Sequence, residues 1–129
     1  MTSPEVLALL ERSRTELSAA RSLAERDFAA QAIGHAYYAT FFAAEGALLA
    51  LGETRSKHSG IISAFGQLLV KGGGLDAAVG AILRKLFELR NGAVYDAVNV
   101  ENETATAAIA DAERFVGAVD HWLRRRSAK

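Results

Sequence analysis

Apolar residues recur every three or four positions in five long stretches of this chain, and its only proline is Pro4. That spacing places the apolar side chains along one face of an α-helix. Alanine, the residue with the highest helix propensity, contributes 26 of the 129 residues. No stretch of four or more residues alternates as a β-strand would. We therefore predict an all-α protein.

Polar or glycine-containing loops separate the expected helices, which span residues 4–25, 27–51, 57–71, 76–97 and 103–126. The second of these is apolar nearly all round, which indicates a helix at the centre of the molecule. Short loops between long helices favour antiparallel neighbours, and the chain is long enough to form one core. The prediction is a single domain over residues 1–129, an up-and-down bundle of about five helices with a four-helix core.

The charge balance limits the partners that we expect. Lysine and arginine together number 15, as do aspartate and glutamate, so the formal net charge is zero. Broad electrostatic capture of nucleic acid is therefore not expected, and any such contact would be a local patch. The chain has no cysteine, which favours a cytoplasmic location. Neither a signal peptide nor a membrane span is expected, because residues 1–5 lack an apolar core and the longest apolar stretch, 36–51, is too short.

One charge interrupts the apolar stripe of the helix predicted at 76–97. Positions 79, 83, 86, 87, 94 and 97 are apolar, whereas position 90 is arginine. A guanidinium group is costly to bury without a partner. Two interpretations fit this pattern. Arg90 forms a salt bridge with a carboxylate of another helix, such as Glu45, or it points into a cleft or a two-fold interface and holds phosphate.

Two further groups of polar residues are candidate site residues. Asn91 and Tyr95 lie one helical turn apart and share a face; they form either part of a site or a hydrogen-bonded polar edge. The loop 54–59 places basic side chains, among them Lys57 and His58, at the start of the third helix. A helix N-terminus favours anions, so this loop either binds phosphate or is an exposed capping loop. The three histidines lack the spacing of metal ligands, and we expect neither a metal nor a cofactor.

Four segments carry a more specific pattern. They are HAYYATFFAA and ALL within residues 35–49, SKHSG at 56–60, LFELRNGAVYD at 86–96 and ADAERFV at 110–116. Together and in this order they resemble the HEPN superfamily of small helical bundles. The resemblance covers nearly the whole chain and implies a HEPN-like fold.

The resemblance also implies an activity and partners. Catalytic HEPN domains are metal-independent ribonucleases whose site forms between two protomers. Many are toxins encoded beside a small nucleotidyltransferase that neutralises them. For this chain the resemblance implies a homodimer, a nucleotidyltransferase-type antitoxin as partner, and RNA or a nucleotide as ligand.

The same resemblance assigns the candidate catalytic residues. The family motif is an arginine, a polar residue and, a few positions later, a histidine; Arg90 and Asn91 match the first two, and Tyr95 stands in place of the histidine. A phenol has a reference pKa of about 10 and is a poor base at pH 7, where a histidine titrates. His58 would supply an imidazole if its loop folded over the cleft. The tyrosine that antitoxins of some relatives adenylylate falls at Ala97, so this modification is not expected.

Two classes of function remain open at this point. The first is a ribonuclease toxin with a tyrosine-variant motif, in which Arg90 stabilises charge on the phosphorus. The second is a non-catalytic module that binds a nucleotide or nucleic acid through Arg90, Lys57 and His58 and presents it to a nucleotidyltransferase.

Overall fold

The computed structural model describes residues 2–95 and 100–127, with side chains described to residue 93 in the first of these ranges. Five α-helices and one π-helix account for most of these residues, and no strand occurs among them. The elements are α1 (Pro4–Glu25), α2 (Ala29–Ala50), α3 (His58–Phe65), the π-helix η1 (Gly66–Lys71), α4 (Ala77–Tyr95) and α5 (Asn102–Ser127). The prediction of an all-α protein is confirmed.

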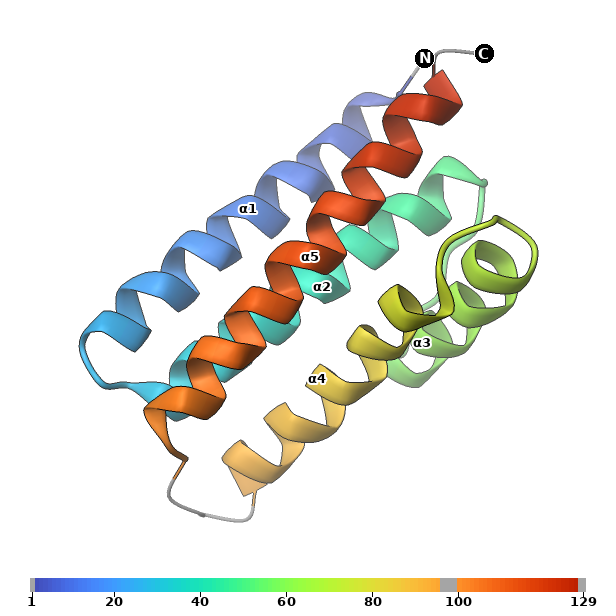
Figure 1. Cartoon of the computed structure of the whole chain (residues 1–129). Coiled ribbons are helices and arrows are strands. Elements are labelled where there is room, and N and C mark those ends of the chain that lie inside the picture. Colours follow the sequence, from blue (N-terminus) through green and yellow to red (C-terminus); the bar gives the residue numbers. More distant parts are fainter. Residues whose placement is uncertain (1, 96–99, 128–129) are drawn as a thin grey trace.

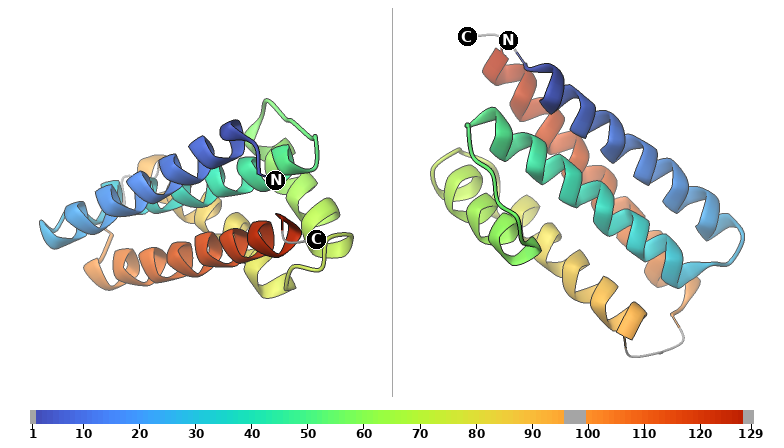
Figure 2. Two further views of the ribbon diagram at one scale, coloured as in Figure 1. Left: turned by 90° about the horizontal axis from the view of Figure 1, so that it is seen from above. Right: turned by 180° about the vertical axis from the view of Figure 1, so that it is seen from behind.

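The four long helices form an up-and-down bundle. Helices α1, α2, α4 and α5 run in alternating directions, while α3 and η1 lie beside α4 (Figures 1 and 2). Both ends of the described chain lie at the same end of the bundle, where the hydroxyl oxygens of Thr2 and Ser127 are 2.7 Å apart. This arrangement confirms the predicted bundle with a four-helix core.

Helix α2 is the central element, as its apolar sequence predicts. It packs against α1, α3, η1, α4 and α5, and Ile33, Tyr37 and Leu48 are completely buried. Small residues on α2 bring α1 close, so that the buried Ser13 hydroxyl donates a hydrogen bond of 2.7 Å to the carbonyl of Ala39. Although α2 is strongly apolar, neither it nor another helix within the described ranges is long and apolar enough to span a membrane.

The first helix follows the sequence prediction and the second begins later. Helix α1 begins at Pro4, and the Ser3 side chain accepts a hydrogen bond of 3.3 Å from the backbone N–H of Val6. The predicted start of the second helix at Asp27 is wrong by two residues. Asp27 has a φ of +66°, which lies outside the right-handed helical region, so α2 begins only at Ala29.

The third helix differs from the prediction in its internal form and the fourth in its first residue. The continuous helix predicted at 57–71 divides into α3 and η1. Helix α4 begins at Ala77, one residue after the predicted start, because the Asp76 carboxylate caps it by accepting a 2.8 Å hydrogen bond from Ala78 N–H. The end predicted at Ala97 lies outside the described residues.

Glycine at position 80 allows η1 to pack directly on α4. A Cβ atom built at Gly80 would lie 2.6 Å from Cγ2 of Val70, closer than carbon atoms pack. The Val70 side chain of the π-helical turn therefore packs on α4 at a point where α4 carries no side chain. This contact helps to hold α3 and its first residue, His58, against the bundle.

Candidate functional site

Arg90 lies on α4 and points toward α2. Its Nη2 donates a hydrogen bond of 3.2 Å to the hydroxyl of Tyr38. The guanidinium carbon is 5.3 Å from the centroid of the Tyr38 ring and 5.9 Å from that of Tyr37, within the range of a cation–π interaction. Arg90 is half-buried, and none of the carboxylates on the described residues pairs with it. The salt bridge with Glu45, one of the two interpretations from the sequence, is not formed.

An aromatic cluster lies beside this guanidinium group, which contacts two of its rings. The rings pack with centroid separations between 4.3 and 6.3 Å. Its members are Tyr37, Tyr38, Phe41 and Phe42 of α2, His58 of α3 and Phe87 of α4. The cluster therefore joins three helices and places an imidazole and two phenols near Arg90.

His58 is held in the cluster from two sides. Its ring stacks on Phe41 with a centroid distance of 4.3 Å and an interplanar angle of 20°. Its Nδ1 atom lies 2.7 Å from the hydroxyl oxygen of Tyr37. The Tyr37 side chain is completely buried, so this hydrogen bond also satisfies a hydroxyl that water cannot reach. The first residue of α3 is thereby fixed against α2.

The local environment keeps both partners of this hydrogen bond uncharged. Burial raises the pKa of Tyr37, and the positive charge of Arg90 opposes this only in part. Burial lowers the pKa of His58, and Arg90 lowers it further. Near pH 7 Tyr37 is therefore a phenol and His58 a neutral imidazole, with one ring nitrogen able to accept a proton.

Glu45, whose negative charge acts on Tyr37, is influenced by a different arginine. Burial raises the pKa of Glu45, and the positive charge of Arg12 opposes this effect. The Arg12 guanidinium carbon lies 4.2 Å from the ring centroid of Phe42. Arg12 is therefore the cation that faces Glu45, which leaves Arg90 directed to the two tyrosines.

The other predicted site residues differ in their positions. Asn91 is half-buried on α4, next to Arg90, and its side chain forms no hydrogen bond with the described residues. Tyr95 is the last residue of α4, and its side chain lies outside the described part of the structure. Lys57 is exposed at the N-cap of α3. The structure thus brings His58, but not the side chain of Lys57, into the cluster beside Arg90.

Sequence analysis missed Tyr37 and Tyr38 as partners of the site. Both were part of an apolar pattern that predicts a central helix, and nothing in that pattern distinguishes a core ring from a ring that holds a functional group. The available signal was the polar end of each side chain, because a buried tyrosine hydroxyl normally requires a hydrogen-bond partner. The partners, His58 and Arg90, come from distant parts of the chain.

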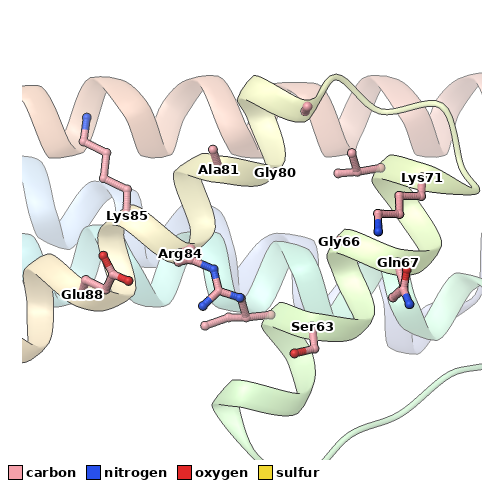
Figure 3. A pocket seen from close by; sticks show the side chains of 12 residues that line it. Ser63, Gly66, Gln67, Lys71, Gly80, Ala81, Arg84, Lys85 and Glu88 are labelled. Carbon is pink, nitrogen blue, oxygen red and sulfur yellow. The ribbon is translucent and has the colours of Figure 1, made fainter.

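A separate groove of about 700 Å³ lies between η1 and α4 (Figure 3). In Figure 3, Arg84 extends from α4 toward the side of Ser63, whereas Lys85 points away and pairs with Asp111 of α5 at 2.8 Å. None of the predicted site residues lines this groove. It is therefore distinct from the aromatic cluster, although both use α4.

The cluster offers groups for binding an anion and for moving a proton. A guanidinium group with no carboxylate partner among the described residues is suited to phosphate, and a neutral imidazole can accept a proton. Among these residues no three histidine, aspartate or glutamate side chains gather as a metal site would require.

These features define a class of protein: a small up-and-down helical bundle with a half-buried arginine on α4. The HEPN domain matches residues 6–122, and the chain belongs to this family. A Methanocaldococcus jannaschii protein named "Putative toxin MJ0605" is 35% identical over 120 residues, which cover 93% of this chain and 90% of the relative. A "UPF0332 protein" of Thermotoga maritima is 34% identical over 113 residues, covering 87% of this chain and 86% of the relative.

Proposed function

We propose that this chain is the toxin of a toxin–antitoxin module and that it cleaves RNA without a metal ion. Membership of the HEPN family supports this proposal, as does the name "Putative toxin MJ0605" of the Methanocaldococcus jannaschii relative. A small nucleotidyltransferase is the proposed antitoxin. The observation that carries the proposal is Arg90, which lies on an aromatic surface and has no carboxylate partner among the described residues.

In this proposal Arg90 binds the phosphodiester and stabilises the negative charge that develops on it during cleavage. Asn91 lies beside it on α4 and contacts the same phosphate or the ribose. Tyr95 completes the motif from the end of the helix, and Lys57, exposed before α3, meets a neighbouring phosphate of the strand. Two protomers that approach through α4 would place two such motifs side by side, so the proposed active form is a homodimer.

A second candidate function follows from the tyrosine at position 95. With a phenol in place of the motif's histidine, the site binds phosphate more readily than it transfers protons. The chain would then be a non-catalytic nucleotide- or nucleic-acid-binding partner of a nucleotidyltransferase. This alternative uses the same Arg90 but requires no cleavage.

Expression of the chain with and without the neighbouring gene of its operon tests the proposal. We expect induction of the chain alone to arrest growth of a bacterial host with loss of RNA integrity, and co-expression of the nucleotidyltransferase to restore growth. Arg90→Ala should abolish toxicity, whereas Arg84→Ala, on the groove side of the same helix, should not. If purified protein binds RNA in EDTA but neither it nor Tyr95→His cleaves it, the binding module is the correct function.

A further inference from the structure

His58 is the one histidine of the three whose side chain enters the aromatic cluster. His35 pairs with Glu16 on the other side of α2, and His121 is exposed on α5. The His58 ring is held in one orientation, because one ring face stacks on Phe41 and Nδ1 is hydrogen-bonded to a buried phenol. Its Nε2 atom has no hydrogen-bond partner among the described residues.

The neighbours of His58 are compatible with proton transfer to a phosphate-bound substrate. The charged and titratable groups that face it are Tyr37 and Tyr38 on α2 and Arg90 on α4. The imidazole and the guanidinium group lie at 5.7 Å and 5.9 Å from the Tyr37 centroid, and at 6.1 Å and 5.3 Å from the Tyr38 centroid. Because both groups lie beside the same two rings, a phosphodiester held by Arg90 would be close to the imidazole.

We propose that His58 is the general base of RNA cleavage and that Tyr37 is the residue that positions it. This inference rests on the ribonuclease function proposed above. It assigns to the start of α3 the role that the family motif gives to a histidine on the helix that carries the arginine. The imidazole that the motif lacks at position 95 is thus supplied by His58, which is far from Arg90 in the sequence but near it in the fold.

The proposed step is an internal transesterification. Nε2 of His58 takes the proton of a ribose 2′-hydroxyl, and the oxygen's electron pair forms a bond to phosphorus. The bond between phosphorus and the 5′-oxygen breaks, its electron pair stays on that oxygen, and water supplies the proton that the leaving 5′-hydroxyl needs. The hydroxide so formed takes the proton from His58. The products are a 2′,3′-cyclic phosphate and a 5′-hydroxyl, and no metal or oxidant is required.

We assign to the 2.7 Å contact between Tyr37 and His58 the tautomer in which the hydroxyl accepts a hydrogen bond from Nδ1–H, before and after Nε2 is protonated. In this tautomer Nε2 carries no proton at the start and is available as a base. Removal of the hydroxyl would free the ring to rotate about its side-chain bonds. We therefore expect Tyr37→Phe to reduce the cleavage rate through a misplaced base, while substrate binding is retained.

Cleavage of a fluorescent RNA by the purified full chain in EDTA tests the inference. His58→Gln and His58→Ala should each lower kcat by about 100-fold with little change in KM, and His121→Gln, a surface histidine control, should behave as wild type. The wild-type rate should fall as pH drops through the pKa of His58, and the residual rate of both His58 variants should lack this dependence. Added imidazole should partly restore His58→Ala.

The outcomes separate this inference from the proposed function. Wild-type cleavage with an unchanged rate in both His58 variants, or with a reduced rate that retains the same pH dependence, overturns the role of His58 and leaves the ribonuclease function intact. No cleavage by wild type overturns both. Circular dichroism and binding of a 2′-O-methyl RNA identify a variant that has lost its fold. If only one of the two His58 variants keeps the wild-type values in these controls, the cleavage rate and pH profile of that variant decide whether His58 is the general base.

Discussion

Arg90 donates one hydrogen bond to Tyr38 and lies over two aromatic rings, without an ion pair to the described carboxylates. A hydrogen bond from a charged donor contributes about 1.5–3 kcal/mol and a cation–π contact at an accessible site about 0.5–1 kcal/mol. Because Arg90 is only half-buried, we expect Arg90→Ala to lower the free energy of unfolding by about 2 kcal/mol. Urea unfolding followed by circular dichroism measures this, with Arg84→Ala as a control on the same helix.

A larger loss would indicate a different role for this arginine. Breaking a buried ion pair by removal of one partner costs about 3–5 kcal/mol, because a charge is left buried alone. A loss in that range for Arg90→Ala would mean that Arg90 stabilises the fold through a carboxylate, and it would count against a phosphate-binding role.

His58 gives a pH dependence of stability with a defined sign. Burial and Arg90 lower its pKa below the ordinary value of 6.5. Between the lowered pKa in the folded chain and the ordinary pKa in the unfolded chain, the unfolded chain binds more protons than the folded chain. The free energy of unfolding therefore decreases as the pH falls. We expect the free energy of unfolding to decrease more steeply for wild type than for His58→Gln between about pH 7 and about pH 5. Urea titrations at several pH values measure the difference.

The comparison with His58→Gln removes the contribution of Glu45, whose raised pKa acts in the opposite sense. Parallel curves for the two proteins would show that the His58 imidazole is as easily protonated in the folded chain as in the unfolded chain.

At this scale the sequence identified Arg90 and His58 as candidates but not the two tyrosines that contact them. Arg90 stands out because it interrupts an apolar helical stripe, and that pattern is local. The contacts of Arg90 with Tyr38, and of His58 with Tyr37, join residues separated by 52 and 21 positions. Such contacts depend on how the helices pack, which periodicity alone does not determine.

At the scale of elements, the contact between η1 and α4 depends on Gly80. An alanine there would place its Cβ atom 2.6 Å from Val70 Cγ2, and such overpacking typically costs about 1–3 kcal/mol. Alanine gains about 1 kcal/mol over glycine in helix propensity, so we expect a net loss of about 1 kcal/mol for Gly80→Ala. Thermal unfolding compares it with Gly117→Ala on α5, where nothing lies within 4 Å of the added Cβ atom.

The paired alanine substitution makes this prediction specific to the contact. Gly117→Ala should stabilise the protein, since only the propensity gain applies. Adding Val70→Ala to Gly80→Ala should recover part of the loss, because it removes the methyl group that clashes. Equal stabilisation by Gly80→Ala and Gly117→Ala would show that η1 does not rest tightly on α4.

The division of the third predicted helix is a feature that periodicity could not reveal. Over 57–71 the apolar spacing fits a continuous helix, yet Gly66–Lys71 adopts the wider π-helical turn. That turn is stabilised by tertiary contacts, among them the approach of Val70 to Gly80. The start of α1, signalled by Pro4 after the Ser3 cap, was predicted correctly.

For the whole molecule, helix number and order followed from the apolar pattern, because each long helix must bury one face and short loops leave few arrangements. The assembly state is not fixed in this way, because one chain does not determine how two copies meet. In the homodimer proposed here, two-fold symmetry brings each α4 to its own copy. Two Arg90 side chains would then approach each other, and like charges at short range repel unless an anion lies between them.

We therefore expect phosphate to strengthen the dimer. Light scattering should give about twice the chain mass of 13.7 kDa at high protein concentration, and inorganic phosphate should lower the dissociation constant of the wild-type dimer. Arg90→Gln removes the repulsion and the anion site together, so its dimer should not respond to phosphate, whereas Arg84→Gln should respond as wild type does. A strict monomer at high concentration, with and without phosphate, would show that Arg90 is completed by a different partner, and the nucleotidyltransferase would be the first to test in the same assay.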